Sequence, residues 1–244
     1  MDIEKRLTEI WASDYMNVLP AQIKERGFCY PVNHEQKDIL ITGFNPSFRE
    51  DETVGNTNAD YNIAFANEKF DPYITPMQRM IFNSENNIDL RAKTAYSDLF
   101  YFREKNQEFL KTHILKAPNG AGVRFVVDQM NLTQHIIENV IKPKLIIVKN
   151  KESWSYWGKL AEEKGWIWMG YKFEFVQNMT CGELFKITGL LDSPERIAPE
   201  FTETNLLNTY VLFTEHIRET TPQERRPTTA VIKTIYDFLL LRKF

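Results

Sequence analysis

Short apolar runs alternate with longer amphipathic segments along much of this chain. Three of the runs, at 39–43, 96–100 and 144–148, have the length of buried strands. Apolar residues at helical spacing between 123 and 141 predict a long helix over one face of the sheet. Strands separated by helical patterns are typical of layered α/β proteins. The pattern therefore predicts a three-layer α/β/α fold with a central, mainly parallel sheet.

Both ends of the chain carry helical patterns of their own. Residues 2–18 and 228–241 each place apolar side chains near a helical period, and both segments predict helices. The segments 21–36 and 49–72 are interpreted as irregular connections. We interpret residues 1–244 as a single domain, to which the two terminal helices are additions.

Alternating apolar and polar residues predict a hairpin in the last third of the chain. Its strands are expected at 171–177 and 183–191, separated by a turn around Gly182. A final short strand is expected at 209–214. The hairpin is interpreted as an addition to the parallel core.

The first predicted strand ends at a glycine, Gly43, and the loop that follows it contains a proline, Pro46. Gly43 permits conformations closed to other residues, and Pro46 removes a backbone donor. Loops at the carboxyl ends of parallel strands commonly bind ligands, so Asn45 is expected beside a ligand site. A plainer alternative is an ordinary β-turn, because Asn-Pro often opens turns.

The stretch Gly43-Phe44-Asn45-Pro46 resembles motif one of the uracil-DNA glycosylase superfamily, in which a strand ends in Gly-x-Asn-Pro or Gly-x-Asp-Pro. Residues 95–103 resemble the second strand of that family, whose end supplies a base-reading side chain, here Asp98. Residues 143–148 resemble the third strand. Residues 185–194 lie roughly where a further strand ends in the family's His-Pro-Ser motif.

The resemblance implies a DNA-repair hydrolase that cleaves the N-glycosidic bond of a damaged or deaminated base in DNA. Asn45 is then the catalytic residue, and its side-chain oxygen holds the attacking water. Asp98 accepts a hydrogen bond from a base N–H, which suits a base whose donor pattern differs from that of uracil. Phe44 or Phe48 stacks on the base. The substrate-binding residues implied in this way are Gly43, Phe44, Pro46, Ser47, Phe48 and Asp98.

Two departures from the family pattern leave a second class of function open. Asp98 stands where the family often has asparagine, and Asp192-Ser193-Pro194 lacks the motif's histidine. Asp192 would repel a departing base anion, and His216 is the substitute candidate. The alternative is a non-catalytic module on the same fold that binds a nucleotide, a nucleic acid or a protein. A third interpretation is an unrelated flavodoxin-like α/β protein in which Gly43-Phe44-Asn45-Pro46 is only a turn.

Composition excludes few classes of function. The chain has 244 residues, of which 43% are hydrophobic and 26% charged, and its net charge is −3. This balance gives no support for nucleic-acid binding from the total charge. No signal peptide or membrane-spanning run is visible, and the two cysteines are far apart, so a cytoplasmic protein is expected. The four histidines are scattered, and neither a metal nor a cofactor is expected.

Overall fold

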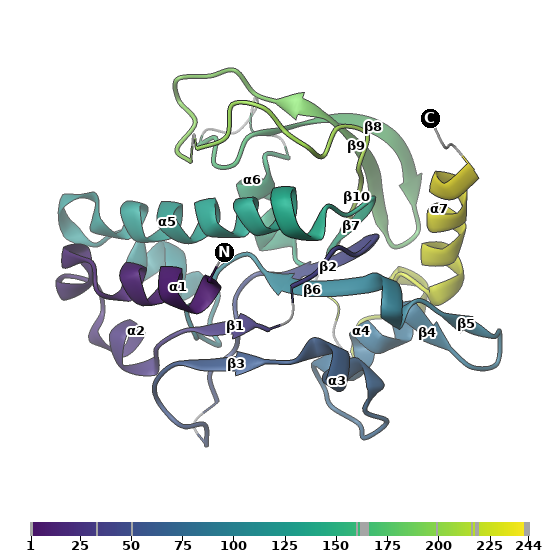
Figure 1. Cartoon of the computed structure of the whole chain (residues 1–244), viewed down its shortest axis with the longest axis horizontal. Coiled ribbons are helices and arrows are strands. Elements are labelled where there is room, and N and C mark those ends of the chain that lie inside the picture. The colour runs from purple at the N-terminus through teal and green to yellow at the C-terminus, as the bar shows by residue number, and fades with distance from the viewer. Residues whose placement is uncertain are drawn as a thin grey trace.

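A six-stranded sheet forms the centre of this mixed α/β protein (Figure 1). The computed structural model describes residues 2–32, 34–49, 51–159, 161, 166–198, 200–215, 217 and 220–241. The strands lie in the order β6 (Thr94–Asp98), β2 (Ile39–Gly43), β7 (Leu145–Val148), β10 (Tyr210–Thr214), β9 (Gly182–Leu190) and β8 (Tyr171–Met179). The first four are parallel, whereas β9 and β8 form an antiparallel hairpin at one edge.

The three strands predicted from the apolar runs are neighbours in the sheet. Gly43 of β2 pairs with Asp98 of β6, and Thr42 pairs with Val148 of β7. Because these strands are parallel and in this register, their carboxyl ends meet at one edge. The side chains that follow them are therefore brought together.

Helices contribute to both of the apolar clusters that the sheet residues join. They are α1 (Ile3–Trp11), α2 (Ala21–Arg26), α3 (Tyr61–Ala66), α4 (Ile74–Ile81), α5 (Ala121–Ile136), α6 (Trp154–Trp157) and α7 (Thr229–Leu241). Successive residues of a strand face opposite sides, so Leu40 packs in one apolar cluster and Ile41 in the other. Phe125 of α5 joins Leu40, whereas Met77 of α4 and Ile232 of α7 join Ile41. Helix α1 lies beside α5 (Figure 1).

Several short elements depart from the sequence predictions. The segments read as irregular contain α2, α3 and a parallel pair made by β1 (Cys29–Pro31) and β3 (Thr57–Ala59). The first helix ends at Trp11, and a separate 3-10 turn follows it. A small hairpin joins β4 (Phe82–Asn83) and β5 (Ile88–Asp89). Elements of two to six residues are too short to show a period in sequence.

The direction of β9 corrects the expected place of the His-Pro-Ser equivalent. Because β9 runs antiparallel to β10, the chain that follows Leu190 leaves the sheet at the edge opposite Asp98. Asp192 is therefore not placed at the carboxyl edge of the parallel strands. The fourth parallel strand is β10, which ends at Thr214. His216 lies outside the described residues.

Within the part of the chain that the structure describes, no helix combines the length and apolar character needed to cross a membrane.

Candidate functional site

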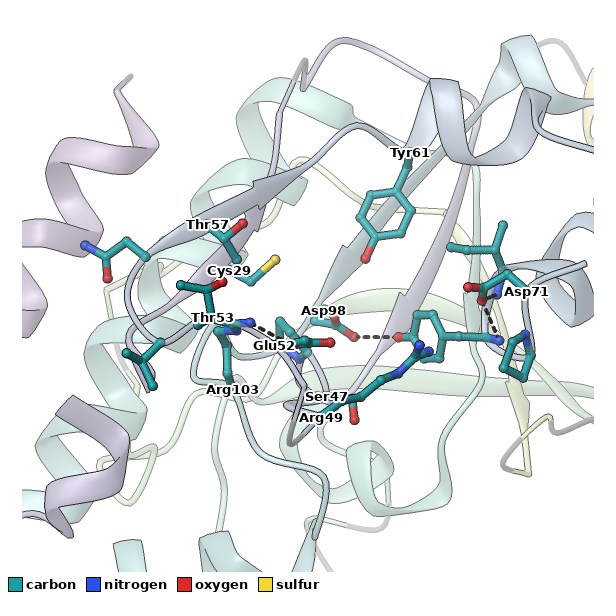
Figure 2. A pocket seen from close by; sticks show the side chains of 16 residues that line it. Cys29, Ser47, Arg49, Glu52, Thr53, Thr57, Tyr61, Asp71, Asp98 and Arg103 are labelled. Atoms are coloured by element: carbon teal, nitrogen blue, oxygen red, sulfur yellow. Dashed lines mark hydrogen bonds and ion pairs between the residues drawn. The ribbon is translucent and has the colours of Figure 1, made fainter. Parts of the chain in front are cut away.

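A cavity of about 640 Å³ lies at the carboxyl ends of β2 and β6 (Figure 2). Its volume is in the range of pockets that enclose small molecules. The walls come from the start of β1, the loop after β2 with β3, the starts of α3 and α4, and the end of β6 with Arg103 beyond it. The lining residues are Cys29, Pro46, Ser47, Arg49, Glu52, Thr53, Val54, Asn56, Thr57, Tyr61, Asp71, Pro72, Tyr73, Ile74, Asp98 and Arg103.

Asp98 is the buried carboxylate of this pocket. It is 3% exposed, and the Tyr96 hydroxyl donates to its Oδ1 at 2.6 Å. The Tyr73 hydroxyl bonds to the Tyr96 hydroxyl and lies 3.5 Å from the same Oδ1. The described residues make no hydrogen bond to Oδ2. One oxygen is thus fixed by the protein, while the other retains its acceptor capacity.

A buried lysine balances this carboxylate. Burial raises the pKa of Asp98 to about 6, although the charge of Lys149 acts in the opposite direction. Burial also lowers the pKa of Lys149 to about 8, opposed by the charge of Asp98. The ammonium of Lys149 lies 4.2 Å from the centroid of the Tyr73 ring. Between these two pKa values both groups are charged, and each stabilises the other in a site shielded from water.

The two pKa shifts predict an unusual dependence of stability on pH. The folded pKa of Asp98, about 6, exceeds its unfolded value of 3.8, so the folded state binds more protons and stability falls as pH rises from about 4 to 6. The folded pKa of Lys149, about 8, is below its unfolded value of 10.5. The folded state therefore binds fewer protons, and stability rises as pH rises from about 8 to 10.5. Urea unfolding at a series of pH values should show a minimum between about pH 6 and 8. A maximum in that window would contradict the arrangement.

Gly43 creates the space that Asp98 and Tyr96 occupy. A Cβ built on Gly43 would collide with Asp98 Oδ1 and with the Tyr96 hydroxyl. Gly43 is buried and does not line the cavity, whereas Asp98 does. The absence of a side chain at this position therefore allows the carboxylate and the hydroxyl to meet.

Gly43→Ala is expected to displace Asp98 and to destabilise the fold by roughly 1–3 kcal/mol, the usual cost of an added group in a packed interior. Urea unfolding measures this cost. Gly120→Ala is the control, because a Cβ there meets nothing within 4 Å although its φ of +68° adds some strain. Equal unfolding free energies for the Gly43 variant and the wild type would show that the carboxylate is not held as described.

Asn45 is 7% exposed and is absent from the cavity wall. Its Nδ2 donates to the backbone oxygens of Pro46 at 2.9 Å, Phe102 at 3.3 Å and Glu104 at 2.6 Å. These bonds fix the amide orientation and join the loop after β2 to the chain beyond β6. The catalytic role of Asn45 stays a prediction.

The other residues of the β2 loop divide into two groups. Pro46 and Ser47 line the cavity, and their role in substrate binding stays a prediction. Phe44 is 2% exposed and packs edge-on against aromatic rings of the core. Phe48 packs against two guanidinium groups, those of Arg26 and Arg103, each 4.8 Å from its ring centroid. Neither phenylalanine lines the cavity, and their stacking on a base stays a prediction.

Arg103 holds the outer wall of the cavity in place. Its Nη1 donates to the backbone oxygens of Thr53 at 3.0 Å and Gly55 at 2.9 Å, and its Nη2 pairs with Glu52 at 2.6 Å. A third bond from Nη1 reaches the Arg26 carbonyl at 3.1 Å. Arg103 is 5% exposed, so this charge is committed to positioning the wall.

Sequence reasoning missed three members of the Asp98 cluster. Tyr96 stands two residues before Asp98 on β6 and therefore faces the same side of the sheet. Lys149 directly follows β7, at the same edge. The positions of Tyr96 and Lys149 relative to Asp98 can be inferred from the sequence once β6 and β7 have been assigned. Tyr61 belongs to a segment read as irregular, and no sequence signal separates it from other aromatic residues.

No group of three or more His, Cys, Asp or Glu side chains among the described residues is arranged to hold a metal ion. The polar groups that line the cavity include the Asp98 carboxylate, the hydroxyls of Tyr61 and Tyr73, Ser47 and Arg49. No model of a protein family matches this chain, and no curated protein matches it either.

Proposed function

We propose that this chain is a divergent uracil-DNA glycosylase-like protein of three-layer α/β/α architecture whose pocket binds a nucleobase. The activity we propose is hydrolysis of the N-glycosidic bond. Water adds to C1′ of the sugar as the C1′–N bond breaks, and the base leaves with the bonding electrons and takes up a proton. The substrate is a nucleoside, a nucleotide or a base within an oligonucleotide.

The position of Asp98 carries this proposal. It ends the strand that resembles the family's second strand, and it lines a cavity beside Pro46 and Ser47 of the motif-one loop. A base offers N–H donors at its edge, and the unused acceptor capacity of Asp98 Oδ2 suits such a donor. Tyr73 supplies an aromatic wall against which a planar ring can pack.

The correction at β9 also removes an objection to base release. Asp192 was expected to repel a departing base anion, but β9 leads the chain towards the opposite edge. Electrostatic repulsion from that residue is therefore no argument against hydrolysis. The role of His216 in stabilising the leaving base stays a prediction.

Charge favours a second candidate, a binding module that does not cleave its ligand. The cavity wall carries two arginines, Arg49 and Arg103, against three carboxylates, Glu52, Asp71 and Asp98. Arg103 is already paired with Glu52. DNA binding depends on basic groups that meet phosphates, and this wall has few to offer.

A single-turnover assay for base release tests the proposal. Oligonucleotides containing uracil, hypoxanthine or xanthine, and the corresponding nucleosides, are incubated with wild type, Asp98→Asn and His216→Ala. The control is Asp14→Asn, which makes the same charge change at an exposed position. The expected result is release of a free base by wild type and by the control, with slower release by Asp98→Asn.

Two other outcomes are informative. Binding of a base, nucleoside or oligonucleotide without release would replace the hydrolase by the binding module. Neither binding nor release of any of these compounds would overturn the proposed function.

A further inference from the structure

We infer that the pocket selects a guanine-type base, one that presents two adjacent N–H donors to Asp98 and a carbonyl oxygen to Tyr61. The inference rests on the proposed function and names the ligand class of the same site. It depends on which hydrogen-bonding groups of the pocket the protein leaves unused.

Asp98 offers acceptors only. A carboxylate has two oxygens with about four lone-pair positions. At Oδ1 the Tyr96 hydroxyl donates at 2.6 Å and the Tyr73 hydroxyl lies at 3.5 Å, whereas the described residues place no donor on Oδ2. Both lone-pair positions of Oδ2 therefore remain open, and two adjacent N–H donors can share this oxygen.

Tyr61 offers a donor. In Figure 2 its hydroxyl points into the pocket from the side opposite Ser47 and Arg49. Its ring packs against the Tyr96 ring, with centroids 4.2 Å apart, which fixes its direction. Within the described residues the Tyr61 hydroxyl makes no hydrogen bond to another side chain, so it is available to a ligand oxygen.

The bases differ at the edge that meets these groups. Guanine presents O6, N1–H and the 2-amino group in sequence, which gives one acceptor beside two donors. Uracil has a single N3–H between two carbonyl oxygens. At least one of these oxygens would face the Asp98 carboxylate, and two acceptors repel each other. Adenine has an amino group beside an unprotonated ring nitrogen, and hypoxanthine lacks the second donor. Guanine alone among these matches the acceptors of Asp98 and the donor of Tyr61 together.

The charge beside Asp98 favours a neutral ligand. Lys149 is 3% exposed and already places a positive charge near the carboxylate. A cationic ligand would meet this ammonium, whereas a neutral base with N–H donors would not. The cavity of about 640 Å³ leaves room for the sugar beyond the base.

Calorimetric titration with the 5′-monophosphates of guanosine, inosine, adenosine and uridine tests the inference. The guanine nucleotide is expected to bind about tenfold tighter than the inosine nucleotide, since one charge-assisted hydrogen bond distinguishes them. Asp98→Asn should weaken guanine binding by about 100-fold, because an amide donor would then face ligand donors. Asp14→Asn should leave affinity unchanged.

The results separate this inference from the proposed function. Tightest binding of the uridine or adenosine nucleotide would overturn the guanine preference while the pocket remained a base site. Equal guanine affinity in wild type and Asp98→Asn would overturn the role of Asp98 in selection. Failure of every nucleotide, nucleoside and oligonucleotide to bind would overturn both.

Discussion

Asp98→Asn is expected to make the protein more stable at neutral and alkaline pH while it weakens guanine binding by about 100-fold. The native carboxylate is 3% exposed, and burial raises its pKa from 3.8 to about 6. A shift of this size corresponds to roughly 2–3 kcal/mol of lost stability once the group is ionised. An amide carries no charge, and its oxygen still accepts from Tyr96.

The stability difference should depend on pH in a defined way. Near pH 4 Asp98 is protonated in the wild type, so the two proteins should unfold at similar urea concentrations. The advantage of the variant should grow as pH rises to about 8, since Lys149 then loses the proton that balances Asp98. Asp14→Asn should differ from wild type by less than about 0.5 kcal/mol. If the Asp98→Asn variant is less stable than wild type at pH 8, the ionised Asp98 carboxylate does not destabilise the folded protein.

Asn45→Asp is expected to destabilise the fold more than Asn45→Ala does. The alanine variant leaves three backbone oxygens without their donor, at a cost of roughly 2–3 kcal/mol. The aspartate variant adds a further acceptor beside those oxygens, and repulsion between acceptors increases the cost. The family resemblance by itself treats asparagine and aspartate as equivalent at this position, so the pair of variants separates the two views.

Urea unfolding at pH 7.5 measures both variants. Asn86→Asp, in an exposed turn, makes the same chemical change where no buried carbonyls are involved, and it should be nearly neutral. If Asn45→Asp is as stable as the wild type, the side chain is not fixed by the carbonyls of Pro46, Phe102 and Glu104.

The parallel core was predictable because its strands are buried on both faces. Apolar runs such as Ile39–Gly43 leave a clear signal in sequence, and their parallel pairing follows from the helical patterns between them. The hairpin was predictable from alternation. The direction of β9 relative to β10 was not, because the pattern of a single strand carries no information on which neighbour it pairs with.

The site residues at or just after the ends of core strands were predictable, whereas those in short elements elsewhere in the chain were not. Asp98 ends one core strand and Ser47 lies in the loop after another, so topology alone places them at one edge. Tyr61 and Arg103 depend on short elements and on contacts between distant segments, such as the bond from Arg103 to the Gly55 carbonyl. The bracing bonds of Asn45 were equally hidden, because they join residues 57 and 59 positions apart.

An NMR titration of the Asp98 carboxyl carbon, with and without a bound base, tests the role of Asp98 most directly. Without ligand, we expect a pKa of about 6 for Asp98, raised by burial. With the guanine nucleotide bound, we expect a lower pKa, because N–H donors stabilise the charged carboxylate. A pKa near 3.8 in the free protein, or a pKa that responds to no base, would show that Asp98 is not a buried base-reading group.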